Sequence, residues 1–111
     1  MRIFHIATSA DWAAAQKCGV YTRSTLARSL AEEGFIHAAY SSQWPKVLAR
    51  HFVGVYEPLV LLEVDTGRLT SVVIEEQPVP GSEMICPHIY GPLNLDAVVS
   101  ISDVTRPEEY V

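Results

Sequence analysis

Three histidines occupy positions where an imidazole can carry out acid–base chemistry. His5, His37 and His88 each lie within a predicted strand, and their neighbours on the same strand face are apolar, small or aromatic. Such neighbours favour burial, and a buried imidazole without hydrogen-bond partners costs about 1–3 kcal/mol. Imidazole is also the side chain whose proton affinity suits proton transfer near neutral pH. We therefore predict that two or more of these histidines share one pocket, the alternative being three separate core histidines satisfied by their neighbours.

Carboxylates in the predicted strands are candidate partners for the imidazoles. Glu75 and Glu76 are adjacent and point to opposite faces, so one of them must face the side on which the pocket lies. Glu63 interrupts an apolar run, either because it faces an open side of the sheet or because it is buried with a partner. The fourth histidine, His51, lies on the apolar stripe of a predicted helix and is interpreted as a partly buried helix residue.

Small polar residues gather where predicted strands give way to helices, namely Thr8, Ser9, Ser41, Ser42 and Gln43. Free backbone N–H groups at the start of a helix bind phosphate or carboxylate, whereas the alternative is that these side chains only cap the helices. The patterns GxSxG, GxGxxG, HExxH and the Walker loop are absent from the sequence. The enzyme classes that depend on those patterns are therefore excluded.

The strands that must position these residues are predicted from apolar runs, alternation and turn residues. Pro87 is expected to exclude its strand from the centre of a sheet. The predicted strands cover residues 2–7, 35–39, 59–64, 72–76, 84–90 and 97–101, with a short extended piece at 20–22. The faces that carry the histidines consist of Ile3, His5 and Ala7; Phe35, His37 and Ala39; and Cys86, His88 and Tyr90.

Two helices are predicted between the first two strands. The first starts near Ala10 after a cap at residue 8 or 9, and Gly19 stands where a left-handed C-terminal cap belongs. The second is expected to start at residue 24 or 25 and to end at Gly34. Both predictions use cap residues together with apolar residues at helical spacing.

A third helix, expected to be the longest, follows the second strand. Ser41 is predicted to cap it, Pro45 falls in its first turn, and its apolar stripe includes Trp44, Leu48 and Phe52. Three helices in the first half, with most strands after them, do not form a regular alternation. We therefore predict an α+β fold with strongly bent, mostly antiparallel sheets and about three helices.

Length and composition fit a single domain, residues 1–111, with 49% apolar and 19% charged residues. A net charge of -5 disfavours non-specific nucleic-acid binding, which needs a basic surface. Cys18 and Cys86 have neither metal-ligand spacing nor a disulfide pattern and are interpreted as reduced thiols. The N-terminal apolar run is too short for a signal peptide or a membrane span, so we expect a cytoplasmic protein, monomeric or weakly dimeric.

Six segments follow one another over nearly the whole chain, of which GFIH and PHIYGPL are the most specific. They are FHIATSADW, SLAEEGFIH, the helix from Gln43 to Phe52, LVLLEVD, the strand with Glu75 and Glu76, and PHIYGPL followed by DAVV. In this order they resemble a small, mostly bacterial family known as domain of unknown function nine-fifty-two.

That family is similar in fold to ADP-ribosyltransferases, including RNA 2′-phosphotransferase, which bind NAD or ADP-ribose in a cleft between two bent sheets. The resemblance implies that His5, followed closely by Thr8, holds a ribose hydroxyl. Ile6 stands where that superfamily usually has glycine, and Ala38 and Ala39 stand where relatives often have Cys-Ser.

The resemblance implies an enzyme, or a degenerate enzyme, of ADP-ribosyl type, with NAD or a related nucleotide as ligand. The implied catalytic residues are His37, His88 and Glu75, with Glu76 as the other candidate carboxylate, and the implied ligand-binding residues are His5, Thr8, Gln43 and Tyr90. One alternative is a binding module without turnover that recognises a small anion or a nucleotide. Another is a zinc site, because three neutral imidazoles can hold zinc with an open position.

Overall fold

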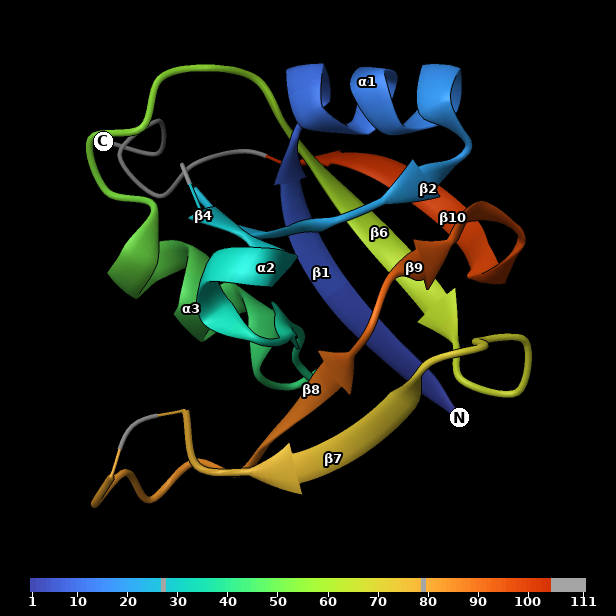
Figure 1. Ribbon diagram of the computed structural model, residues 1–111. Helices are drawn as coiled ribbons and strands as arrows, with labels where there is room; N and C mark the ends of the chain where they lie inside the picture. Colours follow the sequence, from blue (N-terminus) through green and yellow to red (C-terminus); the bar gives the residue numbers. More distant parts are fainter. Residues whose placement is uncertain (27, 79, 105–111) are drawn as a thin grey trace.

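The protein has an α+β structure in which antiparallel sheets are combined with three helices, as the sequence predicts (Figure 1). The computed structural model describes residues 1–26, 28–78 and 80–104. Within these ranges every strand pairing is antiparallel. No helix among these residues is long and apolar enough to span a bilayer.

The first sheet has β6 (Leu59–Asp65) between β1 (Arg2–Thr8) and β10 (Val98–Val104). β6 is apolar at most positions and is the central strand that the sequence predicts. The register of β1 and β6 places His5 opposite Leu62, which is fully buried. His5 itself is 3% exposed, so water has little access to it.

The second sheet has β8 (Cys86–Tyr90) between β5 (Ile36–His37) and β7 (Val72–Glu76). The prediction that Pro87 excludes its strand from the centre of a sheet is wrong. β5 contributes only two residues, and its pairing with β8 ends at His88, so Pro87 has a strand partner on the β7 side alone. The N–H that proline lacks is therefore not required for pairing with β5.

Two short ribbons complete the strands. β2 (Val20–Tyr21) pairs with β9 (Leu93–Asn94), and β3 (Arg23–Thr25) pairs with β4 (Arg28–Ser29). A short 3-10 helix, η1 (Leu95–Ala97), leads from β9 into the last strand of the first sheet. The second ribbon occupies the segment that the sequence predicts as the first half of a helix.

Helix α1 (Ser9–Cys18) has the ends that the sequence predicts. Thr8 is its N-cap, and its hydroxyl oxygen accepts a hydrogen bond of 3.0 Å from the backbone N–H of Asp11. Gly19 ends the helix in the left-handed conformation, with φ of 92°. Thr8 thus satisfies one of the free N–H groups at the start of the helix.

Helix α2 (Leu30–Glu33) begins later than predicted, because β3 and β4 pair with each other ahead of it. Ser24 is fully buried in β3, and its hydroxyl donates to the carbonyl oxygen of Phe35 at 2.5 Å. Ser29 and Glu32 form a capping box that starts the helix, a pattern that is visible in the sequence and was missed. Gly34 ends the helix, as predicted.

Helix α3 (Trp44–His51) is shorter than α1, so the prediction that it is the longest helix is wrong. Its N-cap is Gln43 rather than Ser41, and no side chain makes a cap hydrogen bond. The predicted apolar stripe is correct: Leu48 and Phe52 are buried and pack in one cluster with Ile6. α3 therefore lies against β1, and Figure 1 shows α2 on the same side of that strand.

A single bridge ties the two sheets together next to the histidines. Phe4 of β1 pairs with Ala39, and the two backbone hydrogen bonds between them measure 2.7 and 2.8 Å. Because Ala39 follows β5 by two residues, this bridge holds β5 beside β1. His5 and His37 are thereby brought to the same place, although 32 residues separate them.

Candidate functional site

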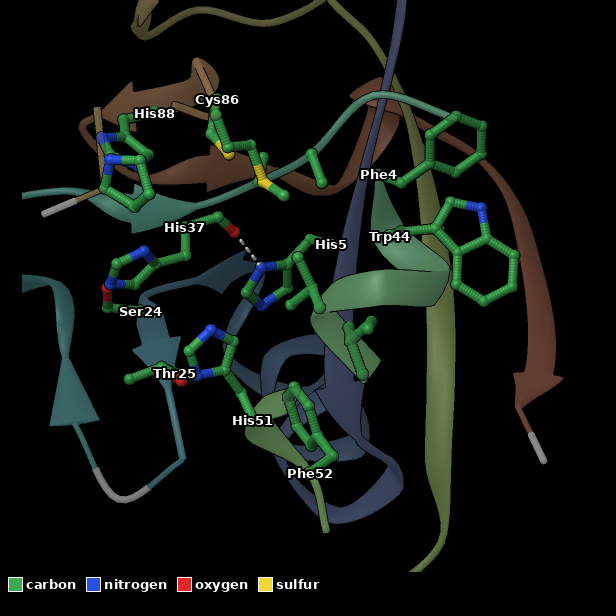
Figure 2. A pocket seen from close by; sticks show the side chains of 16 residues that line it. Phe4, His5, Ser24, Thr25, His37, Trp44, His51, Phe52, Cys86 and His88 are labelled. Atoms are coloured by element: carbon green, nitrogen blue, oxygen red, sulfur yellow. Dashed lines mark hydrogen bonds between the residues drawn. The ribbon is translucent and has the colours of Figure 1, made fainter. Parts of the chain in front are cut away.

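A pocket of about 270 Å³ lies between β1, β3, β5, β8 and helix α3 (Figure 2). All four histidines line it, together with apolar and aromatic side chains and two hydroxyl residues. The lining residues are Phe4, His5, Ile6, Ser24, Thr25, His37, Ala38, Ala39, Trp44, Val47, His51, Phe52, Pro78, Met84, Cys86 and His88. None of these residues is a lysine, arginine, aspartate or glutamate, so the wall is mainly apolar, with imidazoles as its main polar groups.

The register of the second sheet brings His37 and His88 together. The two residues are paired directly across β5 and β8, and their rings meet edge to face with centroids 5.3 Å apart. Phe35 stacks on the ring of His88 with centroids 4.1 Å apart and an angle of 17° between the planes. The predicted strand faces around both histidines are correct, and Phe35 covers one side of the pair.

Glu76 holds the ring of His88 in one orientation. The Nδ1 atom of His88 lies 2.8 Å from Oε1 of Glu76, and the same carboxylate oxygen accepts a hydrogen bond from the hydroxyl of Tyr90. The bonds from Tyr90 and His88 lower the pKa of Glu76, so it is ionised near neutral pH and Nδ1–H is the donor.

The other ring nitrogen of His88 has no partner. His88 is 1% exposed, and its Nε2 atom is buried without a hydrogen bond to any group among residues 1–26, 28–78 and 80–104. With Nδ1–H bonded to Glu76, the neutral form of the imidazole has its lone pair at Nε2. A buried polar atom without a partner is costly, and such an atom calls for an explanation.

His37 has a carboxylate of its own. Its Nε2 atom lies 3.3 Å from Oε1 of Glu33, the last residue of α2, and Arg28 contacts the other oxygen of that carboxylate at 3.0 Å. Burial lowers the pKa of His37, although the bond to Glu33 opposes this effect. The site therefore contains two glutamate–histidine pairs whose imidazoles touch.

His5 is bonded at both ring nitrogens. Nδ1 lies 2.5 Å from the carbonyl oxygen of His37, so it is the donor, and Nε2 lies 2.8 Å from the hydroxyl of Tyr21, from which it accepts. Burial lowers the pKa of His5 from 6.5 to about 4, which keeps it neutral, and burial raises the pKa of Tyr21, which keeps its proton. His5 lines the pocket with its ring and holds the backbone of β5 in place.

The remaining candidates from the sequence lie outside this pocket. Glu75 is exposed, and its carboxylate accepts a 2.6 Å hydrogen bond from the hydroxyl of Tyr40. Gln43 bonds the backbone of residues 40 and 85, and Thr8 lies in a separate, open hollow beside the start of α1. Tyr90 contacts the site only through the carboxylate of Glu76 and the ring of Phe35.

Several residues of the site were missed by sequence reasoning. Glu33 stands four residues before His37, a spacing that a search for acidic partners could have found. Tyr21 is 16 residues from His5 and gives no local pattern that points to it. His51, interpreted as a partly buried helix residue, is exposed and also lines the pocket.

The thiols of Cys18 and Cys86 differ in their exposure to solvent. Cys86 is buried and lines the pocket, and burial raises the pKa of its thiol, whereas Cys18 is exposed at the end of α1. Neither cysteine forms a disulfide. In the part of the chain that the structure describes, no group of three histidine, cysteine or acidic side chains is arranged to hold a metal ion.

Comparison with known proteins identifies relatives of the chain. The family model named "Protein of unknown function (DUF952)" matches residues 6–101. The crystal structure of protein CC0527 from Caulobacter crescentus is 30% identical with a TM-score of 0.78, over 95% of this chain and 87% of that one. The solution structure of CC0527 is 26% identical with a TM-score of 0.62, over 93% and 84% of the two chains. No curated protein matches the sequence significantly.

Proposed function

The chain belongs to the DUF952 family of proteins of unknown function. From the geometry of its site we propose that the histidine-lined pocket binds a small ligand of nucleotide type, such as NAD or ADP-ribose. In this proposal His88, held by Glu76, accepts a hydrogen bond from the ligand and serves as its general base. NAD and ADP-ribose are the first ligands to test, because the sequence resemblance implies a fold similar to that of ADP-ribosyltransferases.

The observation that carries the proposal is the unpartnered Nε2 atom of His88. A ligand hydroxyl or amide N–H would satisfy this lone pair, whereas bulk water has little access to a residue that is 1% exposed. Glu76 fixes which nitrogen carries the proton and would stabilise the imidazolium formed on proton transfer. A base oriented by a carboxylate, with no protein partner at its other nitrogen, is the arrangement that general-base catalysis uses.

The size and lining of the pocket limit which part of a nucleotide enters it. A volume of about 270 Å³ lies just below the usual range for ligand pockets of roughly 300–1,000 Å³. The lining contains no arginine or lysine, so a pyrophosphate inside it would lack a cationic partner. We therefore propose that a single ring, a nicotinamide or a ribose, occupies the pocket, with the rest of the nucleotide outside.

In an ADP-ribosyl transfer, an acceptor hydroxyl would form a bond to C1 of the ribose while the bond from C1 to the nicotinamide nitrogen breaks. His88 would take the proton of that hydroxyl, and the electron pair of the broken bond would leave with nicotinamide. A carboxylate beside C1 would stabilise the positive charge that develops there. Glu75 is not among the lining residues and Glu76 is engaged by His88, so the site supports binding and proton transfer better than it supports this stabilisation.

A binding module without turnover is therefore the second candidate. The observation that favours it is the lack of any carboxylate among the pocket-lining residues. Saturable binding of NAD or ADP-ribose without release of nicotinamide over a long incubation would select this candidate. Release of nicotinamide that depends on His88 would select the enzyme.

The test is a titration of the protein with NAD, ADP-ribose, nicotinamide and ribose, followed by calorimetry and by NMR of the imidazole nitrogens. We expect the Nε2 resonance of His88 to move on binding, and His88→Gln to weaken binding about tenfold, the worth of one buried hydrogen bond. Glu76→Gln and Glu75→Gln are matched variants, because the same change is made at adjacent residues on opposite strand faces. Only Glu76→Gln is expected to weaken binding. Equal effects of the two, or no shift at His88 with millimolar ligand, would contradict the proposal.

The thiols provide an independent readout of where a ligand binds. A ligand in the pocket should slow alkylation of Cys86, which lines it, and leave alkylation of exposed Cys18 unchanged. Protection of neither thiol by a ligand that binds would place the binding site elsewhere on the protein.

A further inference from the structure

One of the four pocket histidines has a ring without a protein partner. His5, His37 and His88 each have a ring nitrogen bonded to a carbonyl, carboxylate or hydroxyl. His51 makes no side-chain hydrogen bond or ion pair with any residue in the described ranges. It is exposed, yet it lines the pocket, and Figure 2 shows its ring turned towards the interior of the pocket from the end of α3.

His51 places an imidazole ring at the rim of the pocket, at the end of a helix. His51 is the last residue of α3, where the free carbonyl groups of the helix end stabilise a cation. The carboxylates of the site, Glu33 and Glu76, are bonded to His37 and His88. Among the residues that the structure describes, no acidic side chain lines the pocket.

A second polar group stands on the same side of the pocket. Thr25 lies in β3, lines the pocket and is half-buried, and its hydroxyl makes no hydrogen bond within the ranges that the structure describes. The preceding residue, Ser24, is fully buried and bonded to the carbonyl oxygen of Phe35, so this part of β3 is fixed. Thr25 and His51 both line the pocket, and in the view of Figure 2 both are drawn on the side opposite Cys86.

From these observations we propose that His51 and Thr25 form a subsite for a phosphate group at the rim of the pocket. An imidazolium and a hydroxyl can both donate to phosphate oxygens, and bonds to a charged acceptor are stronger than bonds to a neutral one. With His88 taking a hydroxyl at the buried end, the ligand class is a phosphorylated sugar or a nucleotide whose sugar enters first. This inference rests on the proposed function and adds the group that remains outside the apolar part of the pocket.

The experiment compares ribose with ribose 5-phosphate by calorimetry on the full chain. Ribose 5-phosphate should bind at least tenfold more tightly than ribose, since hydrogen bonds to a charged phosphate are stronger than bonds to a neutral acceptor. His51→Gln and Thr25→Val should each remove most of this advantage, measured as the ratio of the two affinities in the same variant. His51→Lys and Thr25→Ser are the matched controls, because they keep a cation and a hydroxyl and should keep most of the advantage.

The outcomes separate this inference from the proposed function. If ribose binds and moves the His88 resonance but the phosphate adds no affinity, the subsite is wrong and the proposed function stands. If the phosphate adds affinity that His51→Gln does not reduce, the anion binds elsewhere and the subsite is again wrong. If neither sugar moves any histidine resonance, the proposed function fails together with the inference. Thermal melting of the four variants checks that they fold, which exposed or half-buried positions should permit.

Discussion

We expect the free energy of unfolding to fall on acidification at pH values that are still too high to protonate most carboxylates. The main cause is His5. Burial lowers the pKa of His5 from 6.5 to about 4 in the folded protein, whereas the unfolded chain keeps the ordinary value of about 6.5. Between these values the unfolded chain binds a proton that the folded protein excludes. The free energy of unfolding therefore falls as the pH falls from about 6.5 towards 4.

The magnitude follows from the difference between the two pKa values. Linkage gives a loss of about 2 kcal/mol between pH 7 and pH 4.5, against a total stability of about 5–15 kcal/mol for an ordinary domain. The hydrogen bonds of His5 also predict a loss of stability in acid, because a proton on Nε2 would displace the hydrogen bond that this atom accepts from Tyr21. Burial also lowers the pKa of His37, which adds a loss in the same direction. Glu76 has its pKa lowered below 4.5, so its contribution is lost at a lower pH.

The assay is urea unfolding at several pH values between 7 and 4.5, for the wild type and for His5→Gln. Glutamine does not titrate, so the variant should lose about 2 kcal/mol less than the wild type over this range. NMR titration of the His5 ring gives its pKa directly, even if His5→Gln fails to fold. A midpoint near 6.5, or the same pH dependence in both proteins, would refute the account of His5 as a buried neutral imidazole.

Three substitutions test the remaining contacts by urea unfolding at pH 7. Tyr21→Phe leaves Nε2 of His5 without its donor inside the core and should cost about 1–3 kcal/mol. Gly91→Ala should cost more than 1 kcal/mol, roughly, because the added methyl carbon would lie 2.4 Å from the hydroxyl oxygen of Ser71. Leu62→Ala removes a fully buried side chain from the central strand and should cost about 2–5 kcal/mol. A cost below about 0.5 kcal/mol, the range of ordinary surface substitutions, would contradict the contact concerned.

The strands were predictable because their evidence is local. Apolar runs and period-two alternation place a side chain on a strand face without knowledge of the partner strand, and the strand β7 (Val72–Glu76) was predicted with its observed bounds. The faces of His37 and His88 were correct for the same reason. The pairing of β5 with β8 joins residues about 50 positions apart, so their contact was a hypothesis from residue type rather than from pattern.

The choice between Glu75 and Glu76 shows where local evidence stops. Alternation established that the two point to opposite faces, but which face meets the pocket depends on the register of β7 against β8. In the structure Glu76 is paired with Cys86, on the face of His88, and Glu75 is paired with Pro87 on the other face. A shift of one residue in that register would have exchanged the two glutamates.

The second helix was misplaced because two local patterns competed. Polar residues suitable for a helix start stand at both 24–25 and 29, and the sequence analysis predicts the earlier start. The hydrogen bond from buried Ser24 to Phe35 and the pairing of Arg23 with Ser29 stabilise a ribbon instead. The capping box of Ser29 and Glu32 is the more specific start, because two side-chain bonds act together there.

Burial alone does not distinguish a structural histidine from a functional one, but the count of satisfied nitrogens does. His5 and His88 are 3% and 1% exposed, yet His5 has partners at both ring nitrogens and His88 has one at Nδ1 only. The cost of burying His5 is offset by bonds within the fold, whereas no group among the described residues offsets the cost of burying Nε2 of His88, and under the proposed function the ligand does so. Substitution of His5 should therefore lower stability more than it lowers ligand affinity, and substitution of His88 should do the reverse.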